Sequence, residues 1–235
     1  MPAEYSKGRL LGKGNIMSFR IYKNRLFGGA VVALALMIPA VASDDSPGMK
    51  AFRSGDYATA YKEWRPLADK GDANAQCNLG IMYQKGLGVD RDPAQAFQLF
   101  QASADKGNAQ AEYQLAQMYA KGWGVPQSFS SALMWTQKSA AAGDPDGENR
   151  MGWLYDEGYG VQKDAKQAAY YYRLAAEKGN VDAQFSLGLA YEKGSGVHKD
   201  NAEAAKWLTM SAKQGNTKAQ AELELLQQKD QLTKK

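Results

Sequence analysis

The sequence predicts an all-α fold, a solenoid of about four to five stacked helical hairpins. Five Gly-Asx pairs stand 36 residues apart, beginning at Gly71, Gly107, Gly143, Gly179 and Gly215. A fixed period of this length is typical of proteins that stack one supersecondary unit on the next. Within each unit, apolar residues spaced i, i+4 indicate helices with one buried stripe. Such units bury a continuous core between neighbours and leave a long surface for binding.

The first part of the chain has the composition of a secretory signal. Arg20, Lys23 and Arg25 precede an apolar run over residues 26–38, and an A-x-A box ends at Ala42. This order predicts a signal peptide over residues 1–42 with cleavage after Ala42. A membrane anchor is the weaker interpretation, because a spanning helix needs about 20 apolar residues. We therefore expect a periplasmic (or secreted) protein of a Gram-negative bacterium.

The start of translation is open between Met1 and Met17. A signal counted from Met1 is longer than the usual range of about 15–30 residues, whereas one counted from Met17 falls within it. In the second case residues 1–16 would not belong to the protein.

Charge and composition exclude several classes of function. The whole chain has a formal net charge of +4, but residues 1–42 hold six of its 29 basic and one of its 25 acidic residues. The remainder has a net charge of −1, so the sequence gives no indication of a nucleic-acid-binding face. Cys77 is the single cysteine and His198 the single histidine. An internal disulfide is excluded, and no metal site or cofactor is expected.

The period divides the mature chain into three parts. Residues 43–70 read as an N-terminal capping hairpin, residues 71–216 as four units of 36 residues, and residues 217–235 as a C-terminal capping helix and tail. In the last part Glu224 and Gln227 take the places of the small residue and the tyrosine of the units. Polar residues at these places suit the end of a stack.

The first helix of each unit carries a constant pattern. An apolar residue and a tyrosine four places later form the stripe, with a small residue between them that lets a second helix approach closely. The stripe comprises Leu79 and Tyr83, Leu115 and Tyr119, Met151 and Tyr155, and Leu187 and Tyr191. The small residues are Gly80, Ala116, Gly152 and Gly188.

Paired glycines and a capping residue separate the two helices of each unit. A glycine just past the last turn suits the left-handed conformation that ends many helices. The glycine pairs are Gly86 and Gly88, Gly122 and Gly124, Gly158 and Gly160, and Gly194 and Gly196. The second helices then begin behind Asp92, Ser128, Asp164 and Asp200, which are N-cap residues by type.

The pattern A-x-x-x-L-G-x-x-Y-x-x-G-x-G-V-x-x-D-x-x-x-A, closed by A-x-x-G-[ND], resembles the Sel1-like repeat, a relative of the tetratricopeptide repeat. The resemblance covers residues 46–230. It implies an α/α right-handed superhelix whose usual role is protein–protein interaction.

The same resemblance implies a concave groove lined by the varying positions of the first helices. Tyr113, Trp153 and Phe185 would be aromatic anchors there without a role in the core, although packing between hairpins is the alternative. The predicted groove residues are Tyr113, Gln117, Lys121, Asn149, Trp153, Asp156, Glu157, Phe185, Leu189 and Glu192. Trp123 and Tyr159 in the turns form a secondary edge.

No catalytic residue is predicted. Ser103 and Lys106 match an S-x-x-K motif, but Ser103 falls on the small-residue seam and the accompanying motifs of serine acyl enzymes are missing. Cys77 occupies a freely varying helix position, and His198 a turn. We interpret all of them as structural or incidental, and expect no enzyme.

The sequence thus predicts an exported module that binds a protein or peptide partner through its groove. An immunity protein that inhibits a periplasmic toxin or enzyme is one alternative, and a cell-wall-directed hydrolase is another. A structural element that self-associates is a third, and the oligomeric state is left open.

Overall fold

The computed structural model of the protein describes residues 46–233, and of residues 230–233 the backbone alone. The predicted signal peptide, its cleavage site and both candidate start positions lie outside these residues. The structure therefore bears on the predicted capping hairpin, the four units and the final helix.

Every regular element between residues 46 and 233 is an α-helix. The helices are α1 (Pro47–Arg53), α2 (Tyr57–Asp69), α3 (Ala73–Lys85), α4 (Pro93–Ala104), α5 (Ala109–Lys121), α6 (Phe129–Ala141), α7 (Pro145–Glu157), α8 (Ala165–Glu177), α9 (Val181–Lys193), α10 (Asn201–Lys213) and α11 (Thr217–Thr233).

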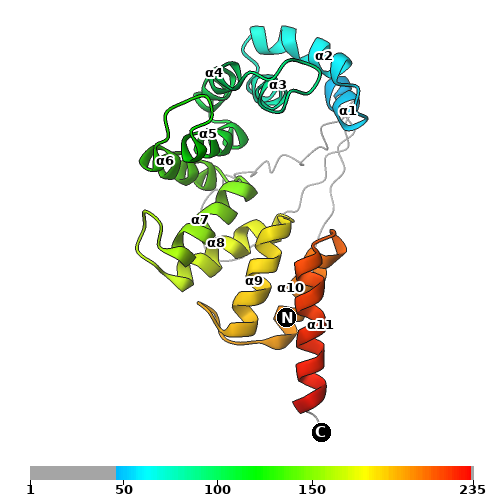
Figure 1. Ribbon diagram of the computed structural model, residues 1–235, viewed down its shortest axis with the longest axis vertical. Coiled ribbons are helices and arrows are strands. Elements are labelled where there is room, and N and C mark those ends of the chain that lie inside the picture. Colours follow the sequence, from blue (N-terminus) through cyan, green and yellow to red (C-terminus); the bar gives the residue numbers. More distant parts are fainter. Residues whose placement is uncertain (1–45, 234–235) are drawn as a thin grey trace, which may run out of the picture. The chain divides into compact units, whose positions relative to one another are not determined.

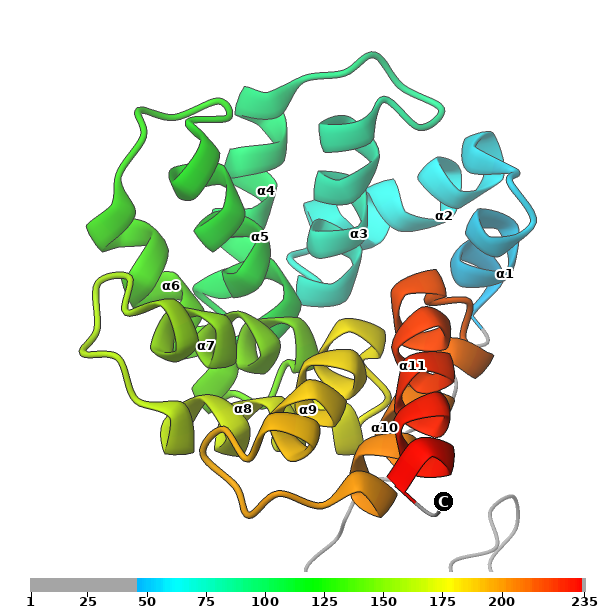
Figure 2. The same ribbon diagram turned by 60° about the horizontal axis from the view of Figure 1, so that its bottom comes forward.

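The helices pack in chain order (Figure 1). The pairs α3–α4, α5–α6, α7–α8 and α9–α10 make the closest hairpins, and each hairpin contacts the next one along the chain. Figure 2 shows the same succession from another side, with α1 and α2 before the first hairpin and α11 after the last. Contacts are therefore mostly between neighbours, with α5 also touching α7. This confirms the predicted all-α superhelical solenoid.

Local signals set the ends of the helices. The Asx residue of each period caps the following first helix; the Asp72 carboxylate, for example, accepts a hydrogen bond from the Ala75 amide at 2.8 Å. Each first helix ends at a glycine with left-handed backbone, such as Gly122 with φ of 68°. Side-chain oxygens of Asp92 and Ser128 accept amide hydrogen bonds at the starts of α4 and α6. Because these caps recur in each period, every hairpin has nearly the same length.

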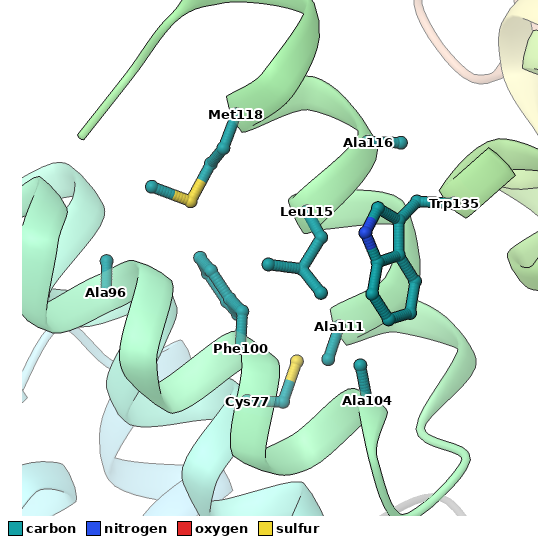
Figure 3. Packing of buried hydrophobic residues seen from close by; sticks show 9 residues of the cluster. All are labelled: Cys77, Ala96, Phe100, Ala104, Ala111, Leu115, Ala116, Met118 and Trp135. Atoms are coloured by element: carbon teal, nitrogen blue, oxygen red, sulfur yellow. The ribbon is translucent and has the colours of Figure 1, made fainter. Parts of the chain in front are cut away.

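The core lies between consecutive hairpins. Figure 3 shows one of its clusters, which contains Phe100 of α4, Leu115 and Met118 of α5, and Trp135 of α6. Cys77 of α3 belongs to the same cluster and is 1% exposed. One hairpin thus supplies only part of each cluster, which is why a hairpin cannot bury its apolar stripe alone.

Small residues let the two helices of a hairpin approach. A β-carbon at Gly152 would lie 2.6 Å from the Tyr172 ring, and one at Gly80 would lie 2.6 Å from the Phe100 ring. These distances are shorter than any real side-chain contact, so the aromatic ring of the second helix uses the space that glycine leaves.

The two ends of the stack differ. At the first end, Trp64 of α2 is buried with Leu79 and Met82 of α3. At the other end, Glu224 and Gln227 of α11 are exposed, so the outer face of the last helix is polar. None of the helices within residues 46–233 is long and apolar enough to cross a membrane.

Candidate binding pocket

A pocket of about 700 Å³ lies between α5, α6 and α7. Its walls come from two consecutive hairpins, because α5 and α6 belong to one and α7 with its following turn to the next. The lining residues are Tyr113, Ala116, Gln117, Ala120, Lys121, Phe129, Ala132, Leu133, Thr136, Arg150, Trp153, Leu154, Tyr159 and Gly160. Most of these side chains are apolar or aromatic, which is typical of a ligand-binding pocket.

Aromatic rings and one guanidinium group form the wall on the α7 side. The rings of Trp153 and Tyr159 stack with centroids 5.1 Å apart. The Arg150 guanidinium lies 4.0 Å from the Trp153 ring centroid, on the ring face. Together these contacts hold Trp153 in one orientation, so a bound group would meet a preformed surface.

Burial shapes the titration of two polar groups in the lining. It raises the pKa of the Tyr113 hydroxyl to about 12, helped by the charge of Asp146, so Tyr113 is a neutral donor and acceptor at neutral pH. Burial also lowers the pKa of Arg150, while the nearby Tyr113 opposes that change. The Arg150 guanidinium still remains charged, because its ordinary pKa is far above neutrality.

The pocket exists because one turn stands away from the preceding helix. In three turns, a β-carbon on the second glycine would meet the start of the preceding second helix within 2.7 Å: Gly88 at Tyr57, Gly124 at Pro93 and Gly196 at Ala165.

The remaining turn, which follows α7, differs from these three. A β-carbon at Gly160 would meet only the tip of Leu133, at 3.2 Å. The residue of α6 in the register of Pro93 and Ala165 is Phe129, and it lines the pocket. The gap between this turn and the start of α6 becomes the pocket.

About half of the predicted groove residues lie outside the lining of this pocket. Tyr113, Gln117, Lys121 and Trp153 line it, as does Tyr159 of the predicted secondary edge. The predicted residues outside its lining are Asn149, Asp156, Glu157, Phe185, Leu189, Glu192 and, of the edge, Trp123. Lys121 links the two groups, since its ammonium lies 4.1 Å from the Trp123 ring centroid.

Phe185 and Glu192 contact the end of the stack instead. Phe185 packs against the cluster of Leu208 and Leu226, so it has the role in the core that we did not expect for it. Glu192 forms an ion pair with Lys229 of α11 at 2.8 Å, and this hydrogen bond lowers the pKa of Glu192. The physical reason is that α11 covers the side of α9 that faces the next unit elsewhere.

Sequence reasoning missed the pocket residues that lie off the first-helix rows. Arg150, Phe129, Leu133 and Thr136 line the pocket but were not predicted. One signal was available in the sequence: Phe129 directly follows the capping Ser128, where an apolar ring has no capping role. In the structure 71% of Phe129 is exposed. Arg150 likewise stands in a register that holds Asn78, Gln114 and Ser186 elsewhere.

The side chains that were weighed as catalytic candidates are Ser103, Cys77 and His198, and none lines the pocket. Ser103 donates a hydrogen bond to the Ala73 carbonyl at 2.7 Å and lies in the hairpin seam. Burial, with a contribution from Asp144, raises the pKa of the Cys77 thiol to about 12, which makes it a poor nucleophile. His198 is exposed in its turn. Over residues 46–233, no three His, Cys, Asp or Glu side chains gather in a way that would hold a metal ion.

Four consecutive matches to one family model, described as Sel1 repeat, cover residues 73–108, 109–144, 145–180 and 181–216. The chain belongs to the Sel1 repeat family. Each match corresponds to one Sel1 hairpin, from α3–α4 to α9–α10. No curated protein sequence matches the chain.

Solved Sel1 repeat structures resemble this one. A Sel1 repeat protein from Oxalobacter formigenes is 36% identical with a TM-score of 0.66, over 72% of this chain and 49% of its own. The protein c5321, described as a protective antigen present in uropathogenic Escherichia coli strains displaying an SLR fold, is 32% identical with a TM-score of 0.63, over 75% of this chain and 38% of its own. This chain thus spans half or less of the length of either protein.

A third structure shares the fold alone. The immunity protein Pa5087 from Pseudomonas aeruginosa is 23% identical with a TM-score of 0.53, over 74% of this chain and 69% of its own. Sel1 repeats generally mediate protein–protein interactions, and Sel1 repeat scaffolds are typically not enzymes.

Proposed function

We propose that this Sel1 repeat protein is an exported interaction module that binds a protein or peptide segment in the pocket between α5, α6 and α7. The observation that carries the proposal is the preformed aromatic wall of that pocket. Trp153 and Tyr159 are stacked on each other, and the Arg150 guanidinium also lies over the Trp153 ring. Large aromatic side chains in such a setting commonly dominate the binding energy of an interface.

The chemistry of the lining indicates what the bound segment presents. Lys121 and Arg150 are its two charged residues, and both are cations. The rest of the lining is mostly apolar, with the Tyr113 hydroxyl and the Gln117 amide as further polar groups. The Thr136 hydroxyl donates to the Ala132 carbonyl at 2.8 Å. A segment that inserts one apolar side chain and carries a carboxylate beside it would satisfy both features. The cations would then speed association and select against basic segments.

Export is the second part of the proposal and rests on the composition of residues 1–42. The mature protein would begin at Ser43 and act in the periplasm of a Gram-negative bacterium (or outside the cell). Cell fractionation followed by mass spectrometry of the purified N-terminus tests this part. A mature protein that begins at Met1 or Met17 in the cytoplasm would contradict it.

Site-specific photocross-linking tests the pocket. A benzophenone amino acid at Gln117 would lie in the lining, and the same probe at Met134 provides a matched control, since Met134 is exposed on α6 outside the lining. We expect an adduct of defined mass from position 117 but not from position 134. Trp153→Ala should abolish that adduct, and Arg150→Met should weaken it more for acidic than for neutral segments.

Two results would overturn the proposal. One is the same adduct from positions 117 and 134, because a non-specific encounter does not depend on the pocket. The other is an adduct from position 117 that persists unchanged in Trp153→Ala.

A further inference from the structure

Three of the four Sel1 hairpins are closed by one recurring polar bridge. A side chain just after the second helix reaches back to the start of the first helix, where it meets a glycine carbonyl and a buried side chain of the first turn. In the third unit, Lys178 donates to the Gly143 carbonyl at 2.9 Å and to the Glu148 carboxylate at 2.5 Å.

The first and fourth units repeat this bridge at the same spacing. The Lys106 ammonium donates to the Gly71 carbonyl and to Gln76 at 3.2 Å. The Gln214 amide donates to the Gly179 carbonyl at 3.3 Å and to Gln184 at 2.8 Å.

The second unit has the acceptor of this bridge without the donor. Its buried first-turn residue is Glu112, which is 8% exposed, and residue 142 in the register of Lys106 and Lys178 is alanine. The Glu112 Oε2 atom is buried and accepts no hydrogen bond from residues 46–233. Burial raises the pKa of this carboxyl group, and the Lys138 charge partly opposes the rise.

No ammonium of residues 46–233 lies beside the period glycine of the second unit, nor beside Gly179 of the fourth unit, whose bridge comes from the Gln214 amide. A β-carbon at Gly71 would lie 2.8 Å from the Lys106 ammonium, and one at Gly143 would lie 3.3 Å from the Lys178 ammonium. At Gly107, the corresponding glycine of the second unit, it would have no such neighbour within 4 Å.

We propose that the gap beside Ala142, between Glu112 and the Gly107 carbonyl, is a binding site for a primary alkylammonium group, the chemistry of a lysine side chain. The ligand class follows from the chain itself, because Lys106 and Lys178 show which group fills this position in two sister units. A buried carboxylate without a partner is costly, and an ammonium that reaches it gains a charge-assisted hydrogen bond.

The gap is open to a ligand from solvent, and no cation of α6 occupies it. Ala142 and Gly107 are exposed, so the gap opens to solvent beside a buried carboxylate. In the sister ion pair the lysine is 41% exposed and the glutamate 3%, which is the geometry of a ligand that enters from outside. Lys138 is the nearest cation of α6, but its ammonium lies 4.2 Å from the Trp135 ring centroid and makes no ion pair with Glu112.

Filling the gap from within provides the first test. Ala142 has φ and ψ of −78° and −3°, close to the −85° and 1° of Lys178, so a lysine there projects in the same direction. We expect Ala142→Lys to raise the melting temperature, and Ala142→Met, which adds a chain of similar length without charge, to raise it less. A melting temperature for Ala142→Lys at or below that of Ala142→Met would overturn the assignment.

Binding is then measured with small probes. Thermal unfolding is followed in n-butylammonium chloride and in tetramethylammonium chloride, which has the charge but no N–H donor, at equal concentration. At a butylammonium concentration about ten times its dissociation constant, we expect the melting temperature to rise by about 3–6 °C over the tetramethylammonium control. This difference should vanish in Ala142→Lys, whose own ammonium fills the site. It should become smaller in Glu112→Gln, which removes the charge but keeps an amide acceptor like that of Gln76.

A second pair of probes separates free amines from protein side chains. Nα-acetyl-lysine methylamide is compared with the acetyl-norleucine analogue, which has no ammonium. Stabilisation by the lysine compound assigns the site to a lysine presented by another protein, whereas stabilisation by butylammonium alone assigns it to a free amine. An equal response of wild type, Ala142→Lys and Glu112→Gln to every amine would overturn the proposal.

Discussion

Gly152 and Trp153 are adjacent in α7, yet the structure gives them opposite roles. A β-carbon at Gly152 would lie 2.6 Å from the Tyr172 ring, so the ring must retreat by about 0.8 Å to reach the 3.4 Å of ordinary contact. Tyr172 is buried with Leu187 and Trp207 and has no room to retreat. Gly152→Leu adds three more carbons, and we expect it to lower the free energy of unfolding by about 3 kcal/mol, after the small gain in helix propensity.

Trp153→Ala should cost less. The Trp153 side chain is half-buried at the pocket wall, so truncation removes its stacking on Tyr159 and only part of a core contact. We expect a loss of about 1–2 kcal/mol, below the 3–5 kcal/mol of a fully buried tryptophan. In melting temperature this is about 2–8 °C for Trp153→Ala and about 6–12 °C for Gly152→Leu.

Thermal and urea unfolding followed by far-UV circular dichroism measure both variants, and the cross-linking assay at Gln117 measures capture. Trp153→Ala should keep its helicity at 25 °C and lose capture. If Trp153→Ala unfolds as readily as Gly152→Leu, then Trp153 belongs to the frame and the assignment of the pocket as a binding surface fails.

Three further outcomes are expected. At pH 8 the Cys77 thiol should react with Ellman's reagent at least about 100-fold more slowly in the native protein than in guanidinium chloride, because burial raises its pKa to about 12. Equal rates would contradict its burial. Gly196→Ala should destabilise the protein far more than Gly160→Ala. Both glycines have positive φ, but of the two only Gly196 would place a β-carbon 1.9 Å from a backbone carbonyl oxygen. Urea unfolding of the two variants measures the difference, and equal midpoints would refute it. Below pH 4.5 the melting temperature of wild type should fall towards that of Glu192→Gln. The ion pair with Lys229 lowers the pKa of Glu192, so the stabilisation by this pair is lost when the carboxylate is protonated. Parallel curves of melting temperature against pH for the two proteins, from pH 7 to 3, would contradict this.

The sequence was sufficient for the frame because the frame is set by local chemistry. Asp72 as a cap and Gly122 as a left-handed stop act within one helical turn, so their types alone indicate where helices begin and end. The period then repeats those signals, and the hairpins follow. Small residues such as Gly152 could also be assigned, because only close packing explains a glycine in the middle of a helix.

The candidate sites depend instead on departures from the period. The pocket is lined by both Phe129 and Gly160, two residues from different hairpins that no helical spacing relates. Glu112 is buried as Glu148 is in the same register, and the departure in its unit is Ala142, where two sister units have lysine. That departure is visible in the sequence, but the burial of Glu112 is not, because a glutamate in the first turn of a helix is ordinarily solvated. Phe185 packs against α11, which takes the place of a next first helix, and Cys77 in the same register is likewise buried against the next hairpin.

The closure of each hairpin by its own caps has a genetic consequence. A duplication or loss of 36 residues in phase leaves every turn glycine and every capping residue in its proper place, so the array can lengthen or shorten without redesign. The seam between α6 and the turn after α7, where Phe129 and Gly160 line the pocket, is not copied unless both flanking units are copied together. Array length and recognition can therefore evolve separately in this protein.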